Sequence, residues 1–158
     1  MKFKTYAQDA IMSSRLKKSL SLIFIILLVD QIAKYAALKF LSPYGIVRIL
    51  PFFNLVYVEN TGTAFGMFKF LGSGFFIFVA VLATLFLVYL YLKDSKNWFV
   101  YSLIIAGALG NIIDRLIYGY VIDFVDLHIG TVHWPAFNIA DTAISIGIVL
   151  FLYKNFKK

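Results

Sequence analysis

Long apolar stretches alternate with short polar segments along the chain. Four of the stretches run for about 20 residues with few charges, the length that an α-helix needs to cross ~30 Å of hydrocarbon at ~1.5 Å per residue. The pattern therefore predicts a membrane protein with four transmembrane helices. We expect them near residues 17–38, 71–92, 97–118 and 137–155.

The composition supports lipid, and not water, as the solvent for most of the chain. Hydrophobic residues make up 61% of the 158 positions and charged residues only 15%. A soluble domain carries roughly a quarter charged residues and could not bury this much apolar surface at this length. Cysteine is absent, which excludes disulfides, thiol catalysis and lipidation of the chain on cysteine.

The basic residues are distributed unevenly between the two sides of the predicted bundle. Ten of the 15 lysines and arginines precede the first stretch, lie between the second and third, or follow the fourth. The positive-inside rule then places both termini in the cytoplasm and turns residues 39–70 and 119–136 outward. The net charge of +7 is thus explained by topology, and we expect no nucleic-acid binding. Residues 1–16 form a cytoplasmic arm, either a short surface helix or a disordered segment.

The first outward loop carries strand signals. β-Branched and aromatic residues follow a turn at residues 42–45, and Pro51 interrupts them, which predicts a small outward sheet or hairpin. The segment after it, residues 60–66, contains glycine and other small residues. It is either an ordinary turn or a place where the Asn60 amide holds a peptide main chain. Whether residues 46–60 clamp a substrate or only cap a site stays open.

Three of the apolar stretches contain polar residues. Asp30 and Lys34 are four residues apart, so they share one helix face and can form an ion pair between helices or contact a substrate. In the third and fourth stretches polar or small residues recur at i, i+3, i+4 and i+7, which places them on one face. Because unsatisfied polar groups in hydrocarbon cost several kcal/mol, roughly, the two stripes should face each other. The stripes are Gly107, Gly110, Asn111 and Asp114, and Asn138, Asp141, Thr142 and Ser145.

Two aspartates are candidates for acid and base chemistry. Asp123 and Asp141 lie at the outward ends of predicted spans and are joined by 17 residues, enough to bring the carboxylates to one water. Two such carboxylates share a single proton near neutral pH and can hydrolyse a peptide without a covalent intermediate. His128 and His133 lack metal-ligand spacing, which disfavours zinc. A small transporter or ion pathway is the competing hypothesis, because intramembrane ionisable residues also mark proton relays.

Five motifs in order give the chain a resemblance to bacterial lipoprotein signal peptidase (signal peptidase II), an aspartic endopeptidase. The resemblance covers nearly all of the chain after about residue 20. Within the motifs, no residue departs from the family's pattern. The motifs are Asp30-Gln31 with Lys34, Asn60-Thr61-Gly62-Thr63-Ala64-Phe65, Gly107-Ala108-Leu109-Gly110-Asn111 through Asp114-Arg115, Val121-Ile122-Asp123-Phe124, and Phe137-Asn138-Ile139-Ala140-Asp141.

The resemblance implies a fold and a set of site residues. The expected fold is an all-α integral membrane protein, with four transmembrane helices and a small extracytoplasmic β-cradle in one membrane domain over residues 1–158. It implies that Asp123 and Asp141 are the catalytic pair, without saying which is the base, and that no metal or cofactor is used. The positions implied to bind substrate or support the site are Asp30, Lys34, Asn60, Gly62, Asn111, Asp114, Arg115 and Asn138.

The resemblance also implies a reaction. The enzyme would remove the signal peptide from diacylglyceryl-modified prolipoproteins, cutting on the N-terminal side of the lipidated cysteine. It would sit as a monomer in the bacterial cytoplasmic (inner) membrane, in contact with lipid and with its active site near the outer face. Because acyl chains hold the substrate at the depth of the aspartates, the entropy cost of encounter would be small. We expect Asn60 and Asn138 to hold the peptide backbone, and Arg115 to pair with Asp114 or a neighbouring carbonyl.

Overall fold

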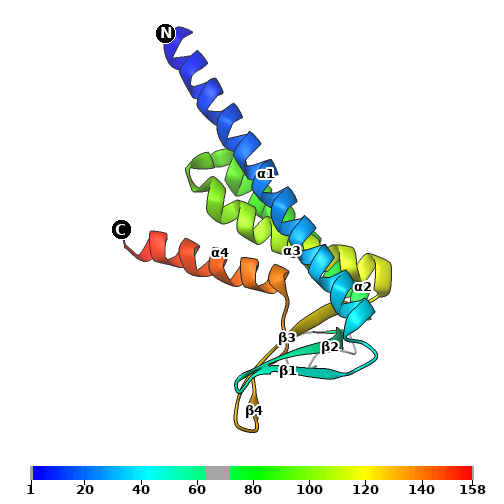
Figure 1. The fold of residues 1–158 in the computed structure, drawn as a ribbon. Coiled ribbons are helices and arrows are strands. Elements are labelled where there is room, and N and C mark those ends of the chain that lie inside the picture. The colour runs from blue at the N-terminus through cyan, green and yellow to red at the C-terminus, as the bar shows by residue number, and fades with distance from the viewer. Residues whose placement is uncertain (1, 63–71, 158) are drawn as a thin grey trace.

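The structure, a computed structural model, describes residues 2–62 and 72–157 and has four long helices with a small sheet at one end (Figure 1). All four helices are long and apolar enough to cross a membrane. The fold class predicted from the sequence is therefore confirmed. The helices are α1 (Lys2–Phe40), α2 (Gly72–Lys93), α3 (Trp98–Tyr118) and α4 (Ile139–Phe156), and a short 3-10 helix, η3 (Ser95–Asn97), joins α2 to α3.

The first helix differs from its predicted extent. Residues 2–16, for which a surface helix and a disordered arm were both open, continue α1 without a break. In Figure 1 the N-terminal turns of α1 extend past the neighbouring helices. Residues 12–40 of α1 contain a stretch that is long and apolar enough to cross a membrane.

The sheet has four antiparallel strands in the order β1-β2-β3-β4. Its first hairpin was predicted, whereas the strands of the second outward loop were not. Residues 63–66 of the segment that follows the hairpin lie outside the described residues. The strands are β1 (Ile46–Leu50), β2 (Phe53–Asn60), β3 (Val121–Ile129) and β4 (Val132–His133).

Helix α3 is the centre of the bundle. It packs against α1, α2 and α4, and about half of its residues are buried. In α2, by contrast, only Tyr91 is buried, so most of that apolar helix is exposed on the outside of the bundle. Gly107 lets α3 approach α4 closely, because a Cβ there would overlap the carbonyl oxygen of Ala140. The two polar stripes therefore meet where α3 and α4 cross, as predicted.

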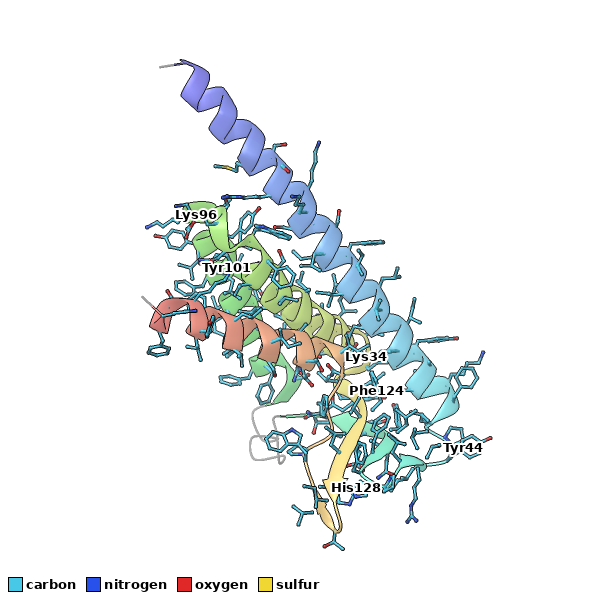
Figure 2. The ribbon with its side chains drawn as sticks, turned by 60° about the vertical axis from the view of Figure 1, so that its left-hand side comes forward. Lys34, Tyr44, Lys96, Tyr101, Phe124 and His128 are labelled. Carbon is cyan, nitrogen blue, oxygen red and sulfur yellow. The ribbon has the colours of Figure 1, made fainter. Side chains whose placement is uncertain are left out.

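Two local features carry the chain from the helices into the site. Gly119 ends α3 in the left-handed conformation with φ 83°, which a glycine adopts without strain, and β3 begins two residues later. At the start of α4, Asn138 and Asp141 form a reciprocal capping box. A small apolar core of Ala37, Ile122 and Phe124 fixes β3 against α1, and Figure 2 shows Lys34 and Phe124 close to this junction.

Candidate active site

Asp123 and Asp141 are brought together by one shared partner, Asn138. The Asn138 side-chain amide donates to Asp123 Oδ1 at 2.7 Å. Its carbonyl oxygen accepts from the backbone N–H of Asp141 at 2.8 Å, and Asp141 Oδ2 accepts from the Asn138 N–H at 3.3 Å. The cap that starts α4 thus also places the two carboxylates of the predicted pair side by side.

Each carboxylate receives a second amide donor. Asn60 Nδ2 donates to Asp123 Oδ2 at 2.9 Å, and Asn111 Nδ2 donates to Asp141 Oδ1 at 2.7 Å. Asn60 Oδ1 also accepts from the Gly62 N–H at 3.1 Å, which closes the turn after β2. Asn60 and Asn138, which we expected to hold a peptide backbone, are therefore engaged with Asp123 in this structure.

The Asp123 carboxyl is only 1% exposed, and its surroundings favour the protonated form. Burial raises its pKa to about 7, and the nearby charge of Asp141 acts in the same direction. The hydrogen bonds from Asn60 and Asn138 and the charge of Lys34 oppose this rise. A carboxyl group with such a pKa is ready both to give and to take a proton near neutral pH.

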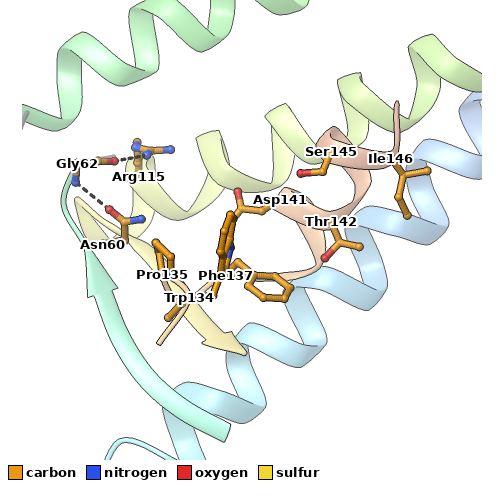
Figure 3. A pocket seen from close by; sticks show the side chains of 11 residues that line it. Asn60, Gly62, Arg115, Trp134, Pro135, Phe137, Asp141, Thr142, Ser145 and Ile146 are labelled. Carbon is orange, nitrogen blue, oxygen red and sulfur yellow. Dashed lines mark hydrogen bonds between the residues drawn. The ribbon is translucent and has the colours of Figure 1, made fainter. Parts of the chain in front are cut away.

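A cavity of about 570 Å³ lies beside the pair (Figure 3). Asp141 lines it, whereas Asp123 does not and is reached through Asn60, which is itself in the wall. One side of this cavity consists of Trp134, Pro135, Ala136 and Phe137. The first three were not among the residues predicted for the site, although they directly precede the motif that begins at Phe137.

Arg115 closes the polar side of the cavity. Its guanidinium donates to the carbonyl oxygens of Asn111 and Gly62, each at 3.3 Å, and lies 5.5 Å from the centroid of the Phe76 ring. Of the two partners expected for Arg115, the structure shows carbonyl groups and not Asp114. The bond to Gly62 ties the end of β2 to α3 at the mouth of the cavity.

Behind the pair lies a buried ionic cluster. Lys34 Nζ is 2.8 Å from Asp30 Oδ2 and 3.0 Å from Asp114 Oδ2, and all three residues are at most 1% exposed. Of the two roles open for Asp30 and Lys34, the structure favours the ion pair between helices. Gln31 belongs to the same cluster, because it donates to Asp114 Oδ1 at 3.0 Å. We did not predict a role for it, although an amide beside Asp30 in an apolar stretch was a signal.

Asp126, three residues after Asp123, belongs to a different cluster. Successive side chains of a strand point to opposite faces, so the two aspartates of β3 diverge. Asp126 accepts from Asn54 at 2.7 Å, and His133 Nδ1 lies 2.8 Å from it. Burial tends to raise the Asp126 pKa, but these two contacts outweigh it and hold the pKa below its usual value. Among the described residues, no three His, Asp or Glu side chains are grouped to hold a metal ion.

Comparison with known proteins identifies the family. The family model described as Signal peptidase (SPase) II matches residues 22–157. The chain belongs to the signal peptidase II family. It is accordingly a membrane-embedded protease of lipoprotein processing, and its four helices make it a multi-pass protein of the bacterial inner membrane.

Relatives and solved structures agree with this family. The chain is 76% identical over 147 residues to a lipoprotein signal peptidase of Thermodesulfovibrio yellowstonii, covering 93% of this chain and 100% of that one. It is 44% identical over 146 residues to one from Burkholderia thailandensis, covering 88% and 87%. Two bacterial membrane enzymes solved by the in meso method, at 2.3 and 1.9 Å, superpose with TM-scores of 0.81. They are 32% and 31% identical to this chain, covering 89% and 90% of it and 88% and 94% of their own chains.

Proposed function

We propose that this signal peptidase is an aspartic endopeptidase in which Asp123 and Asp141 activate one water molecule. The observation that carries the proposal is the Asn138 bridge: its side-chain amide donates to the Asp123 carboxylate and its backbone N–H donates to the Asp141 carboxylate. A carboxyl pKa near 7 at Asp123 supports it, because a pair that shares one proton needs one member that is protonated at neutral pH. The substrate is a diacylglyceryl-modified prolipoprotein, cut on the N-terminal side of its lipidated cysteine.

The proposed reaction needs no covalent intermediate. The ionised carboxylate takes a proton from water while the protonated one donates its proton to the carbonyl oxygen of the scissile bond. The water oxygen bonds to the carbonyl carbon and gives a tetrahedral intermediate. This intermediate collapses when the C–N bond breaks: the leaving nitrogen takes up a proton from the pair, and a hydroxyl of the intermediate returns its proton to the pair as the C=O bond re-forms. Each carboxyl thus ends in the protonation state in which it began or exchanges it with its partner.

The cavity supports entry of an extended peptide beside the pair. Asn60 stands between the open cavity and Asp123 Oδ2, so a water or a substrate carbonyl that displaces its amide would meet both carboxylates. The apolar side formed by Trp134 and Phe137 suits a substrate that carries acyl chains, and Arg115 offers charge on the polar side. Asn60 would then be free to hold the peptide main chain, while Asn138 stays bonded to the pair.

The orientation is part of the proposal. The basic residues gather at one end of the bundle, where Figure 2 shows Lys96, and the sheet and the aspartates lie at the other. Both termini would therefore be cytoplasmic, with the cleavage site near the outer face. Acyl chains of the substrate would hold its scissile bond at the same depth, which lowers the entropy cost of encounter. We expect the enzyme to act as a monomer surrounded by lipid.

Isosteric substitution tests the mechanism. Wild type, Asp123→Asn and Asp141→Asn are incubated in detergent micelles with a diacylglyceryl prolipoprotein, and cleavage is followed as a mobility shift. Asp126→Asn is the matched control, because it removes a carboxylate from the same strand but the opposite face. Circular dichroism and thermal unfolding first establish that each variant is folded. We expect both site variants to lose cleavage and the control to keep it. Near-normal cleavage by either folded site variant would refute the two-aspartate mechanism.

A further inference from the structure

The buried ionic cluster behind the pair is connected to both aspartates through the backbone. Asp114 Oδ2 accepts from the N–H of Ile122 at 3.0 Å, and Ile122 directly precedes Asp123. Asp30 Oδ1 accepts from the N–H of Ala140 at 2.8 Å, and Ala140 directly precedes Asp141. Each carboxylate of the cluster therefore holds the backbone N–H of the residue that precedes one aspartate of the pair.

Lys34 joins Asp30 and Asp114, the two carboxylates that hold this backbone. We infer that Lys34 is a positioning residue, whose ammonium fixes the separation of Asp123 and Asp141 by clamping the two carboxylates that hold their backbone. The inference rests on the proposed aspartic mechanism and adds a role for a residue that does not line the cavity. It differs from a simple stabilising ion pair because both ends of the clamp lead to reacting groups.

The geometry uses the full donor capacity of the lysine. An ammonium has three protons, and Lys34 Nζ lies within 3.1 Å of Asp30 Oδ2, Asp114 Oδ2 and Asn111 Oδ1. The third contact also leads to the pair, since Asn111 donates to Asp141. One ammonium thus connects α1, α3 and, through their acceptors, the start of β3 and the start of α4.

The surrounding packing leaves room for this clamp and little else. A Cβ on Gly110 would lie 2.7 Å from Asp30 Oδ2 and 3.2 Å from the Ala140 Cβ, so glycine there lets the carboxylate sit between α3 and α4. Gln31 donates to the Gly110 carbonyl oxygen at 3.3 Å and to Asp114, which braces the same contact from α1. The clamp is therefore held on several sides by residues of α1 and α3.

A cation is required at this point for electrostatic reasons. Asp30 and Asp114 are both 0% exposed, and removing the cation between two buried carboxylates leaves them without a partner, which is strongly unfavourable. Losing Lys34 would therefore push the two carboxylates apart and loosen their holds on Ile122 and Ala140. The other ionisable groups that face the cluster are Asp123 from β3, Asp141 from α4 and Arg115 from α3. The charge of Lys34 opposes the raised pKa of Asp123.

Three variants separate positioning from charge and from stability. Lys34→Met removes both the clamp and the charge, and Lys34→Arg keeps a cation with several donors. The double variant Asp30→Asn with Lys34→Met restores the net charge of the cluster without restoring the clamp. For each, kcat and KM per folded enzyme are measured across pH in micelles, with a diacylglyceryl prolipoprotein as substrate. Amide hydrogen exchange at Ile122 and Ala140 is followed by NMR, and the Val125 amide, which bonds to the Phe137 carbonyl, is the control.

The expected pattern is specific to a positioning role. In Lys34→Met, kcat falls about tenfold or more with little change in KM, and its pH profile moves to higher pH. Exchange accelerates at Ile122 and Ala140 but not at Val125. The double variant regains the wild-type pH profile but keeps the low kcat, and Lys34→Arg regains part of kcat.

Two results would overturn the inference. The first is a folded Lys34→Met enzyme with wild-type kcat and pH profile, and the second is unchanged exchange at both Ile122 and Ala140. If Lys34→Met does not fold, the double variant decides by the same two measurements. Failure of the proposed function would show itself differently, as cleavage by Asp123→Asn or Asp141→Asn, and the exchange data would still test the clamp. Normal exchange with inactive aspartate variants would reject the clamp alone.

Discussion

Replacing Asp123 with asparagine should stabilise the protein at alkaline pH even though it abolishes cleavage. The Asp123 pKa is about 7 in the folded protein and 3.8 when unperturbed, because the folded chain buries the carboxyl near Asp141. Between these two pH values the folded state binds the proton more tightly than the unfolded state. The free energy of unfolding is therefore greatest below about pH 4 and falls as the pH rises to about 7.

The size of the effect follows from the same two values. The interval from 3.8 to about 7, at about 1.4 kcal/mol for each pH unit, corresponds to about 4 kcal/mol of stability lost by wild type. Asparagine cannot ionise, so the variant avoids this loss. The amide nitrogen of the new asparagine would face the N–H donor of Asn60 or Asn138. One hydrogen bond would therefore be lost, at a cost of about 1 kcal/mol. The variant should thus be about 3 kcal/mol more stable at pH 8, with the two stability curves crossing at about pH 4.5.

Thermal unfolding in detergent micelles between pH 4.5 and 8.5, followed by circular dichroism, measures this difference. The Asp126→Asn variant is the control of opposite sign. The Asp126 pKa is lowered, so its contribution to stability is present at neutral pH and is lost only as the pH falls through that lowered pKa. Parallel curves for wild type and Asp123→Asn across pH 5 to 8 would refute the argument that Asp123 carries a raised pKa.

Two further substitutions test the packing and the wall of the site. Gly107→Ala should cost about 1–3 kcal/mol in thermal unfolding and lower kcat, because the new methyl overlaps the backbone oxygen of Ala140. Gly147→Ala meets mainly a movable side chain and should cost less, so equal effects of the two would contradict this account. Asn60→Ala removes a 2.9 Å hydrogen bond that positions Asp123 and lowers its pKa, so cleavage should fall and the alkaline limb of the pH profile, which follows the protonated member of the pair, should move to higher pH. An unchanged profile with unaltered processing would remove Asn60 from the site.

Much of the fold could be predicted because lipid imposes its pattern directly on sequence. Apolar stretches of spanning length, basic residues on one side and polar residues recurring along one helix face are local or periodic signals. Asp123 and Asp141 were singled out because an ionisable group at the edge of hydrocarbon is expensive without a function. The β1-β2 hairpin was visible from Pro51 and the β-branched residues around it.

The features that were missed depend on partners distant in the chain. The strand β3 begins with an apolar run whose extended form is fixed by pairing with β2, about 65 residues earlier along the sequence. That pairing also decides that Asp123 and Asp126 point to opposite faces, so the second could not be dismissed from sequence. The continuation of α1 through residues 2–16 was also left open, because the apolar residues at helical spacing there are compatible both with a surface helix and with a disordered arm.

The sequence by itself determined which groups are available at the outward ends of the helices. Only the tertiary structure decided which of them touch. Asn60 reaches Asp123, Asn138 bridges both aspartates, and Lys34 draws together carboxylates from α1 and α3. The reason is physical. Hydrophobicity and periodicity are properties of neighbouring residues, so they can be recognised in the amino-acid sequence. A hydrogen bond between buried groups depends on ångström distances that the packing of four helices and a sheet must set.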